Sequence, residues 1–137
     1  MRRQPAALLL ALSLLVALAG CSRGAGDLPD VGVVLELSPR PPRIGPVTAI
    51  VTLKDAAGQP IQNAQVEVER NMSHAGMVPV LGQAIEISPG RYQAQLEFTM
   101  GGDWFILVRA SLPDGRPLQR SIPVPGVDVL CGDTPSP

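Results

Sequence analysis

The chain has 137 residues and a formal net charge of −1, so it lacks the basic surplus that a nucleic-acid-binding surface requires. Its length suits one domain, and with only four aromatic residues the core must be built mainly from aliphatic side chains. Fifteen prolines and fourteen glycines argue against long helices.

The N-terminal segment has the pattern of a bacterial lipoprotein signal peptide. Arg2 and Arg3 precede an uncharged apolar run over residues 6–19, which is too short to span a bilayer comfortably, since that takes about 20 residues. The run ends in Leu-Ala-Gly-Cys21, and small residues before a cysteine resemble the lipobox, in which the cysteine is acylated and becomes the new N-terminus. We therefore expect a signal peptide over 1–20 and lipidation of Cys21. The alternative is a plain signal peptide that is cut elsewhere.

Lipidation predicts a location outside the cytoplasm, on the cell membrane or the outer membrane, because several acyl chains hold a protein where one binds marginally. We expect residues 21–30 to hold the lipidated cysteine and a polar tether, 31–127 to form the domain, and 128–137 to be a flexible tail. No second apolar run is long enough to cross a membrane. A lipidated Cys21 leaves Cys131 without a disulfide partner, so Cys131 is expected to be a free thiol, with intermolecular pairing or a metal role as alternatives.

Beyond the tether, short runs of alternating apolar and polar residues recur between turns rich in Pro and Gly. A period of two is typical of strands with one packed face and one wet face. The spacing of the runs predicts an all-β fold, an antiparallel β-sandwich of about seven strands. The expected strands cover residues 31–38, 46–54, 64–70, 83–88, 91–98, 103–111 and 117–124.

The alternation also predicts which side chains form the core. Trp104 is expected to be a core residue rather than a ligand platform, and Glu67, Glu69, Glu86 and Glu97 are expected on solvated strand faces. Tyr92 follows a Pro-Gly turn, and its hydroxyl is expected to bond nearby backbone, like the tyrosine corner of immunoglobulin-like domains. The inward sets are Val47, Ala49, Val51, Leu53; Val66, Val68; Tyr92, Ala94, Leu96, Phe98; and Trp104, Ile106, Val108, Ala110.

Several segments together resemble the YtkA-like and FixH-like domains. The segments are the strand entry DAAGQPIQNAQV at 55–66, the Met/His loop at 72–77, and a closing pattern made by Gly90, Tyr92, Met100, Gly102 and Trp104. The resemblance spans roughly residues 31–125 and implies a small extracytoplasmic immunoglobulin-like sandwich. FixH-like proteins are associated with the assembly of copper-containing terminal oxidases and carry a transmembrane helix, whereas this chain is expected to carry a lipid. The resemblance therefore suggests copper handling.

The loop NMSHAGMVPV at 71–80 holds the only histidine of the chain, His74, between Met72 and Met77. Thioether sulfur is a soft ligand that prefers Cu(I), and neutral imidazole is a good borderline ligand. Residues two apart on an extended strand end project to the same side, and Gly76 allows the chain to turn Met77 back toward them. Met100 precedes two glycines at another strand end and is a candidate fourth ligand.

The same residues have structural interpretations. Methionine fills irregular gaps in cores, so the loop could cap the sandwich or dock a partner, and the histidine could bond only to backbone. Met100 continues the inward alternation that runs from Tyr92 to Phe98, which favours a core position for it.

No pattern in the sequence indicates an enzyme. One histidine without a nucleophile motif, a paired-histidine motif or a Cys-x-x-Cys motif gives no catalytic triad and no catalytic zinc site. A carboxylate pair for glycoside chemistry is the minor alternative, and it is disfavoured because a domain of this size with so few aromatics has little to form a sugar cleft.

Two functions from different classes follow. The first is a lipid-anchored envelope protein that binds Cu(I) through Met72, His74 and Met77, helped by Met100, for storage, delivery or oxidase assembly, without turnover. The second is a metal-free immunoglobulin-like interaction module that docks an envelope partner.

Overall fold

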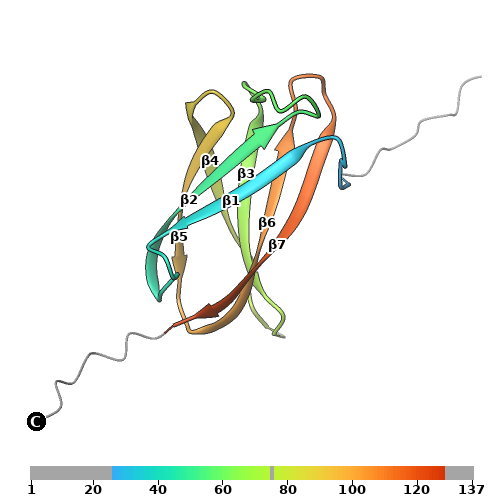
Figure 1. Cartoon of the computed structure of the whole chain (residues 1–137). Helices are drawn as coiled ribbons and strands as arrows, with labels where there is room; N and C mark the ends of the chain where they lie inside the picture. Colours follow the sequence, from blue (N-terminus) through green and yellow to red (C-terminus); the bar gives the residue numbers. More distant parts are fainter. Residues whose placement is uncertain (1–25, 75, 129–137) are drawn as a thin grey trace, which may run out of the picture.

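A computed structural model describes residues 26–74 and 76–128, and both predicted cysteine roles, at Cys21 and Cys131, lie outside these residues. The described chain forms seven antiparallel strands and no helix, which confirms the all-β prediction (Figure 1). No helix within the described ranges is long and apolar enough to span a membrane. The strands are β1 (Gly32–Ser38), β2 (Gly45–Lys54), β3 (Gln65–Met72), β4 (Val80–Ser88), β5 (Arg91–Phe98), β6 (Gly102–Ser111) and β7 (Pro117–Val127).

Strand β4 joins the two layers of the sandwich. The hydrogen-bonded order is β1-β2-β5-β4-β3-β6-β7. The first half of β4, from Val80 to Ala84, pairs with β3, and from Ile85 onward the strand pairs with β5. One layer is therefore β1-β2-β5 and the other is β3-β6-β7, and β4 crosses between them at one flank.

The predicted core is confirmed strand by strand. Each inward set is buried, with Ala49, Val51, Leu53, Val68, Phe98, Ile106 and Val108 fully shielded from solvent. Trp104 is 3% exposed and packs against Phe98, with ring centroids 5.2 Å apart, so the interpretation of Trp104 as core is correct. Burial of an aliphatic or aromatic side chain stabilises a fold by about 1.5–3 kcal/mol, so these rows hold the layers together.

Two glutamates contradict the prediction of solvated strand faces. Glu69 is only 6% exposed, because Arg109 on the neighbouring strand β6 pairs with its carboxylate at 2.7 Å and Asn71 also donates to it. Glu86 is half-buried and accepts hydrogen bonds from the backbone N–H groups of Asn63 and Gly90, at 3.0 and 3.1 Å. Each carboxylate therefore has hydrogen-bond partners within the fold.

At one end of the sandwich, polar groups of the turns are hydrogen-bonded within the fold, and we call this the strap end. Here Tyr92 donates its hydroxyl to the carbonyl of Ile61 at 2.7 Å and accepts the N–H of Ala64 at 3.1 Å, which confirms the tyrosine-corner prediction. Burial raises the pKa of this hydroxyl above its ordinary value of 10.0. Gly90 has φ +70°, and a Cβ there would lie 2.9 Å from the Leu53 carbonyl, so this turn requires glycine.

The chain reaches the sandwich through a fastened segment, residues 26–31, which we call the strap. Gly26 pairs with Leu118 near the start of β7, and its carbonyl accepts the N–H of Gln119 at 2.9 Å. Arg120 binds Asp27 at 2.7 Å and donates to the carbonyls of Leu28 and Val31. At Asp30, the ion pair with Arg116 lowers the carboxyl pKa below its usual range. Half of the expected tether is therefore attached to the domain.

Candidate functional site

The residues predicted to bind metal all lie at the end opposite the strap, which we call the Met/His end. Met72 ends β3, His74 and Met77 belong to the loop before β4, and Met100 lies between β5 and β6. In Figure 1 these loops lie at the bottom of the molecule, together with the end of β7, while the turns of the strap end lie at the top. The fold thus gathers methionines 28 positions apart in the sequence at one end.

The four side chains divide into an inner and an outer pair. Met72 is 7% exposed and Met77 is partly buried against the same core. The terminal methyl of Met72 lies 3.3 Å from the position that a Cβ on Gly102 would occupy, two residues after Met100. His74 is exposed and Met100 is 45% exposed, so the expectation that Met100 continues the inward row is wrong, because the strand ends at Phe98. Metal binding by this set stays a prediction.

The indole of Trp104 lies beneath the Met/His end. Its Nε1–H donates to the backbone carbonyl of Met100 at 3.1 Å, which fixes the loop that carries this methionine. Met72 is the register partner of Trp104 across β3 and β6. The guanidinium of Arg70 lies over the ring, 5.4 Å from its centroid, in a cation–π contact. A single aromatic residue therefore connects two of the methionines to an inward-facing cation.

The candidate donors at the Met/His end are three thioether sulfurs and one imidazole. No three His, Cys, Asp or Glu side chains of residues 26–74 and 76–128 gather in a way that would hold an ion. Divalent zinc or calcium sites are built from such groups, whereas Cu(I) accepts thioether sulfur.

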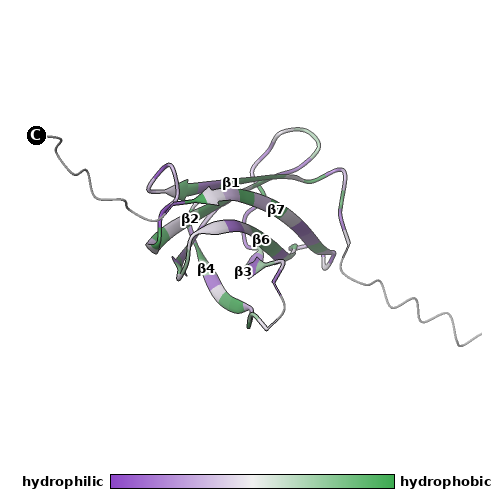
Figure 2. Cartoon of the chain, turned by 90° about the horizontal axis from the view of Figure 1, so that it is seen from below, coloured by the Kyte–Doolittle hydropathy of each residue, from purple (hydrophilic) through white to green (hydrophobic). Residues whose placement is uncertain are grey.

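Strand β4 exposes a row of large aliphatic side chains, which the sequence interpretation missed. Ile85 is 72% exposed, Leu81 58% and Ile87 49%, and Val78 and Val80 extend the row to the Met/His end. Figure 2 shows the green, hydrophobic segments of β4 at the outside of the sandwich. The small residues Gly82 and Ala84 face inward where the strand crosses between layers. We call this row the β4 ridge.

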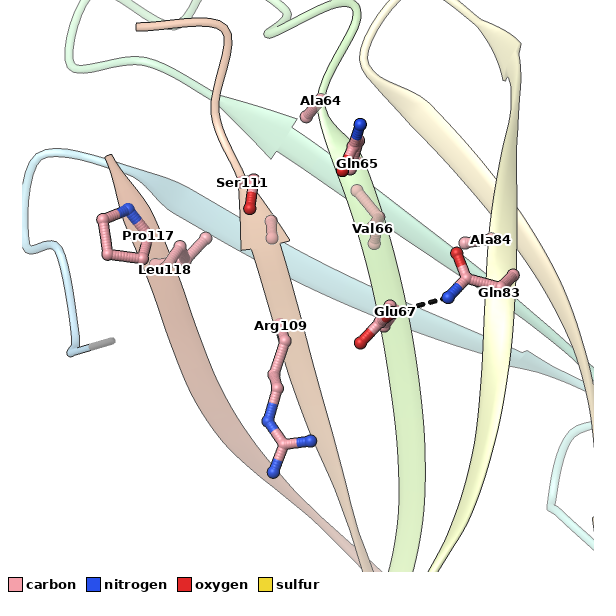
Figure 3. A pocket seen from close by; sticks show the side chains of 11 residues that line it. Ala64, Gln65, Val66, Glu67, Gln83, Ala84, Arg109, Ser111, Pro117 and Leu118 are labelled. Carbon is pink, nitrogen blue, oxygen red and sulfur yellow. Dashed lines mark hydrogen bonds between the residues drawn. The ribbon is translucent and has the colours of Figure 1, made fainter. Parts of the chain in front are cut away.

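The outer face of the β3-β6-β7 layer holds a shallow polar cleft of about 500 Å³ (Figure 3). Arg109, Glu67 and Gln83 line it, and Figure 3 marks the hydrogen bond between the last two. Because Arg109 pairs with Glu69 and Gln83 with Glu67, these polar groups already have partners within the fold. This cleft therefore gives no reason to assign a ligand.

The chain is therefore an immunoglobulin-like β-sandwich whose loops at one end carry methionines and a histidine. The chain belongs to the YtkA-like family, whose sequence model matches residues 28–109. No curated protein sequence matches the chain.

Two kinds of solved structure are similar to this one. A superoxide reductase (neelaredoxin) from Ignicoccus hospitalis aligns over 71% of this chain and 79% of its own, with 10% identity and a TM-score of 0.46. Murine CRIg aligns over 72% of this chain and 98% of its own, with 16% identity and a TM-score of 0.39.

Proposed function

We propose that this protein is a lipid-anchored envelope domain that holds Cu(I) at its Met/His end and passes it on without catalysing a reaction. The observation that carries the proposal is the gathering of Met72, Met77, Met100 and His74 at one end of the sandwich. Three thioethers and one imidazole are a soft donor set, and a position half within the core limits access of water to the ion.

The strap supports a defined orientation for the anchored domain. Four residues, 22–25, separate Cys21 from the fastened Gly26, and this stretch spans at most about 18 Å. The strap end is therefore held near the membrane, and the eleven-residue strand β7 carries the other end about 33 Å further. In this arrangement, the proposed copper ligands face away from the lipid, toward partners that extend from the membrane surface.

The copper proposal is tested by anaerobic titration of residues 22–137 against a chromogenic Cu(I) chelator, with Cys131→Ser in every variant. Methionine-to-leucine changes at positions 72, 77 and 100 remove the sulfur while nearly conserving volume, so the fold is retained. We expect one-to-one binding in the parent and its loss when these changes are combined with His74→Gln. Start-codon Met1 is outside the tested chain, so every methionine sulfur is accounted for. Equal binding in parent and combined variant would contradict the proposal.

The anchor is tested separately, in a bacterial host grown with a labelled fatty acid. We expect label in the full-length chain and none in Cys21→Ser, with the parent entering the detergent-rich phase on partitioning. A labelled Cys21→Ser variant, or an unlabelled parent, would contradict lipidation. This outcome is independent of copper binding, which is measured on the soluble chain.

The β4 ridge favours a second candidate function, docking of an envelope protein without metal. Contiguous exposed aliphatic side chains are typical of interaction surfaces. We expect Ile85→Lys, in an anchored chain exposed to a membrane-permeable cross-linker, to abolish any adduct that the parent forms, while His74→Gln leaves it intact. Loss of the adduct in the His74 variant alone would instead assign partner contact to the Met/His end.

A further inference from the structure

Arg70 occupies a position that the alternation of β3 reserves for the core. Val66, Val68 and Met72 share its face, and all three are buried. The Nε of Arg70 is shielded from solvent and has no hydrogen-bond partner, and no carboxylate within residues 26–74 and 76–128 forms an ion pair with its guanidinium. A shielded donor without an acceptor costs free energy, so an acceptor at this place would stabilise the structure.

A cleft opens next to Arg70 because β4 changes layers. Over Val80–Ala84 the strand pairs with β3, and its pairing with β5 ends at Ile85 on one strand and Gln93 on the other. No strand pairing joins the start of β4 to the end of β5, and a space of about 450 Å³ lies between these two segments. Arg70 lines this cleft together with residues from both layers.

The walls of the cleft combine apolar side chains with the polar side chains of Gln95 and Glu97, beside Arg70. Val80 and Leu81 line one side and are 43% and 58% exposed, and Pro46 and Leu96 also contribute. A cleft of several hundred Å³ in which a few polar groups accompany apolar side chains is typical of small-molecule sites. Glu97, an exposed carboxylate, also lines the cleft and opposes negative charge there, less for a ligand with a single negative charge than for one with several.

We propose that this cleft binds a small monocarboxylate that carries a short apolar chain. The carboxylate accepts hydrogen bonds from the guanidinium of Arg70, and the apolar chain covers Val80 and Leu81. Arginine is suited to this role because its planar guanidinium matches the geometry of a carboxylate. The cation–π contact with Trp104 holds the guanidinium in place before the ligand arrives. None of the four proposed copper ligands lines the cleft, so the two proposals can be tested independently.

The test uses residues 22–137 with sodium hexanoate as the probe and 1-hexanol as the neutral probe of equal length. We expect saturable one-to-one binding of hexanoate by calorimetry, with a Kd below about 1 mM, and none of hexanol in that range. Trp104 is the only tryptophan, so its emission should change along the same curve and locate the ligand. We expect the affinity for hexanoate to fall about 10- to 100-fold in Arg70→Gln. The fall should be smaller in Arg70→Lys, which keeps the positive charge but not the planar guanidinium.

Two further variants separate a site from a general surface effect. Leu81→Glu alters an exposed wall residue without touching the core, and its charge should weaken hexanoate binding at least tenfold. Arg91→Gln removes an exposed arginine elsewhere on the surface, where it pairs with Glu36, and should leave binding unchanged. Binding of hexanol as tight as hexanoate, unchanged binding in Arg70→Gln, or no binding of hexanoate at all would each overturn the proposal.

Discussion

The two ends of this sandwich differ in how completely their polar groups are satisfied. At the strap end, the Tyr92 hydroxyl and the Glu86 carboxylate each bond backbone groups, and the side chain of Asp55 accepts two backbone N–H groups in its turn. At the other end, His74 and Met100 are exposed, Met72 is buried, Met77 is partly buried, and the shielded Nε of Arg70 lacks a partner. The strap end thus has its polar groups paired within the fold, whereas the Met/His end has one buried donor unpaired and two candidate ligands exposed.

The largest expected difference in stability is between two methionines of the Met/His end. Met72→Ala should lower the free energy of unfolding by about 3 kcal/mol, because it leaves a cavity in the core. Met100→Ala should change it by no more than about 0.5 kcal/mol, because its side chain is 45% exposed. Urea denaturation measures both, and equal effects would show that the division into inner and outer methionines is incorrect.

At the strap end, Tyr92→Phe should cost about 2 kcal/mol, because it removes two hydrogen bonds and leaves the Ala64 N–H unpaired. Burial raises the pKa of this hydroxyl in the folded state, so its contribution is present below the unfolded value of 10.0 and is lost as the pH rises through the folded pKa. The stability difference between parent and variant should therefore shrink above pH 10 in urea titrations. A constant difference up to pH 11 would exclude this linkage.

On the outer face, Arg109→Ala should cost about 1.5 kcal/mol, because it leaves the covered Glu69 carboxylate without its ion pair. The exposure of Arg109 keeps this below the cost of breaking a fully buried pair. The matched control is Arg91→Ala, which breaks an exposed pair with Glu36 at 3.5 Å and should cost no more than about 0.5 kcal/mol. Equal costs would mean that burial of Glu69 contributes nothing to the pair.

The smallest expected effect concerns the strap. Arg120→Ala removes one ion pair and two bonds to strap carbonyls, and should lower the free energy of unfolding by about 1 kcal/mol or less. Its local effect should be larger: the amide of Gln119, bonded to Gly26, should exchange its hydrogen faster. Arg91→Ala, whose exposed partner Glu36 lies in β1 outside the strap, is the control. Unchanged exchange at Gln119 would show that Arg120 does not hold the strap.

Most of the fold follows from sequence because alternation and turn residues act locally. The strand 91–98 was predicted with the bounds that β5 has, and the inward rows were assigned residue by residue. The exceptions depend on neighbours that lie far away in sequence. Glu69 is covered because Arg109 reaches it diagonally from β6, where Arg109 is the register partner of Glu67, and the sequence does not contain that register. The isoleucines of β4 face outward on a strand that changes layers.

The candidate site was predictable in part for the same reason. Clustering of Met72, His74 and Met77 in one loop was visible in the sequence, and the fold adds Met100 at the same end. The depth of each side chain was not visible, since burial of Met72 follows from the extension of β3 by two residues beyond its expected end. The inward position of Arg70 was predictable from alternation alone, because Arg70 continues the inward row of Val66 and Val68.

The strap also determines where a pull on the N-terminal side of the domain is first felt. Gly26 runs parallel to its partner Leu118, so a force applied to the chain before Gly26 along the strand axis loads the strap contacts in shear before it reaches β1. These contacts include the Arg120 bonds, which must give way before tension passes to the seven-residue pairing of β1 with β2. Release of the strap contacts alone would lengthen the chain outside the sandwich while the pairing of β1 with β2 stays in place.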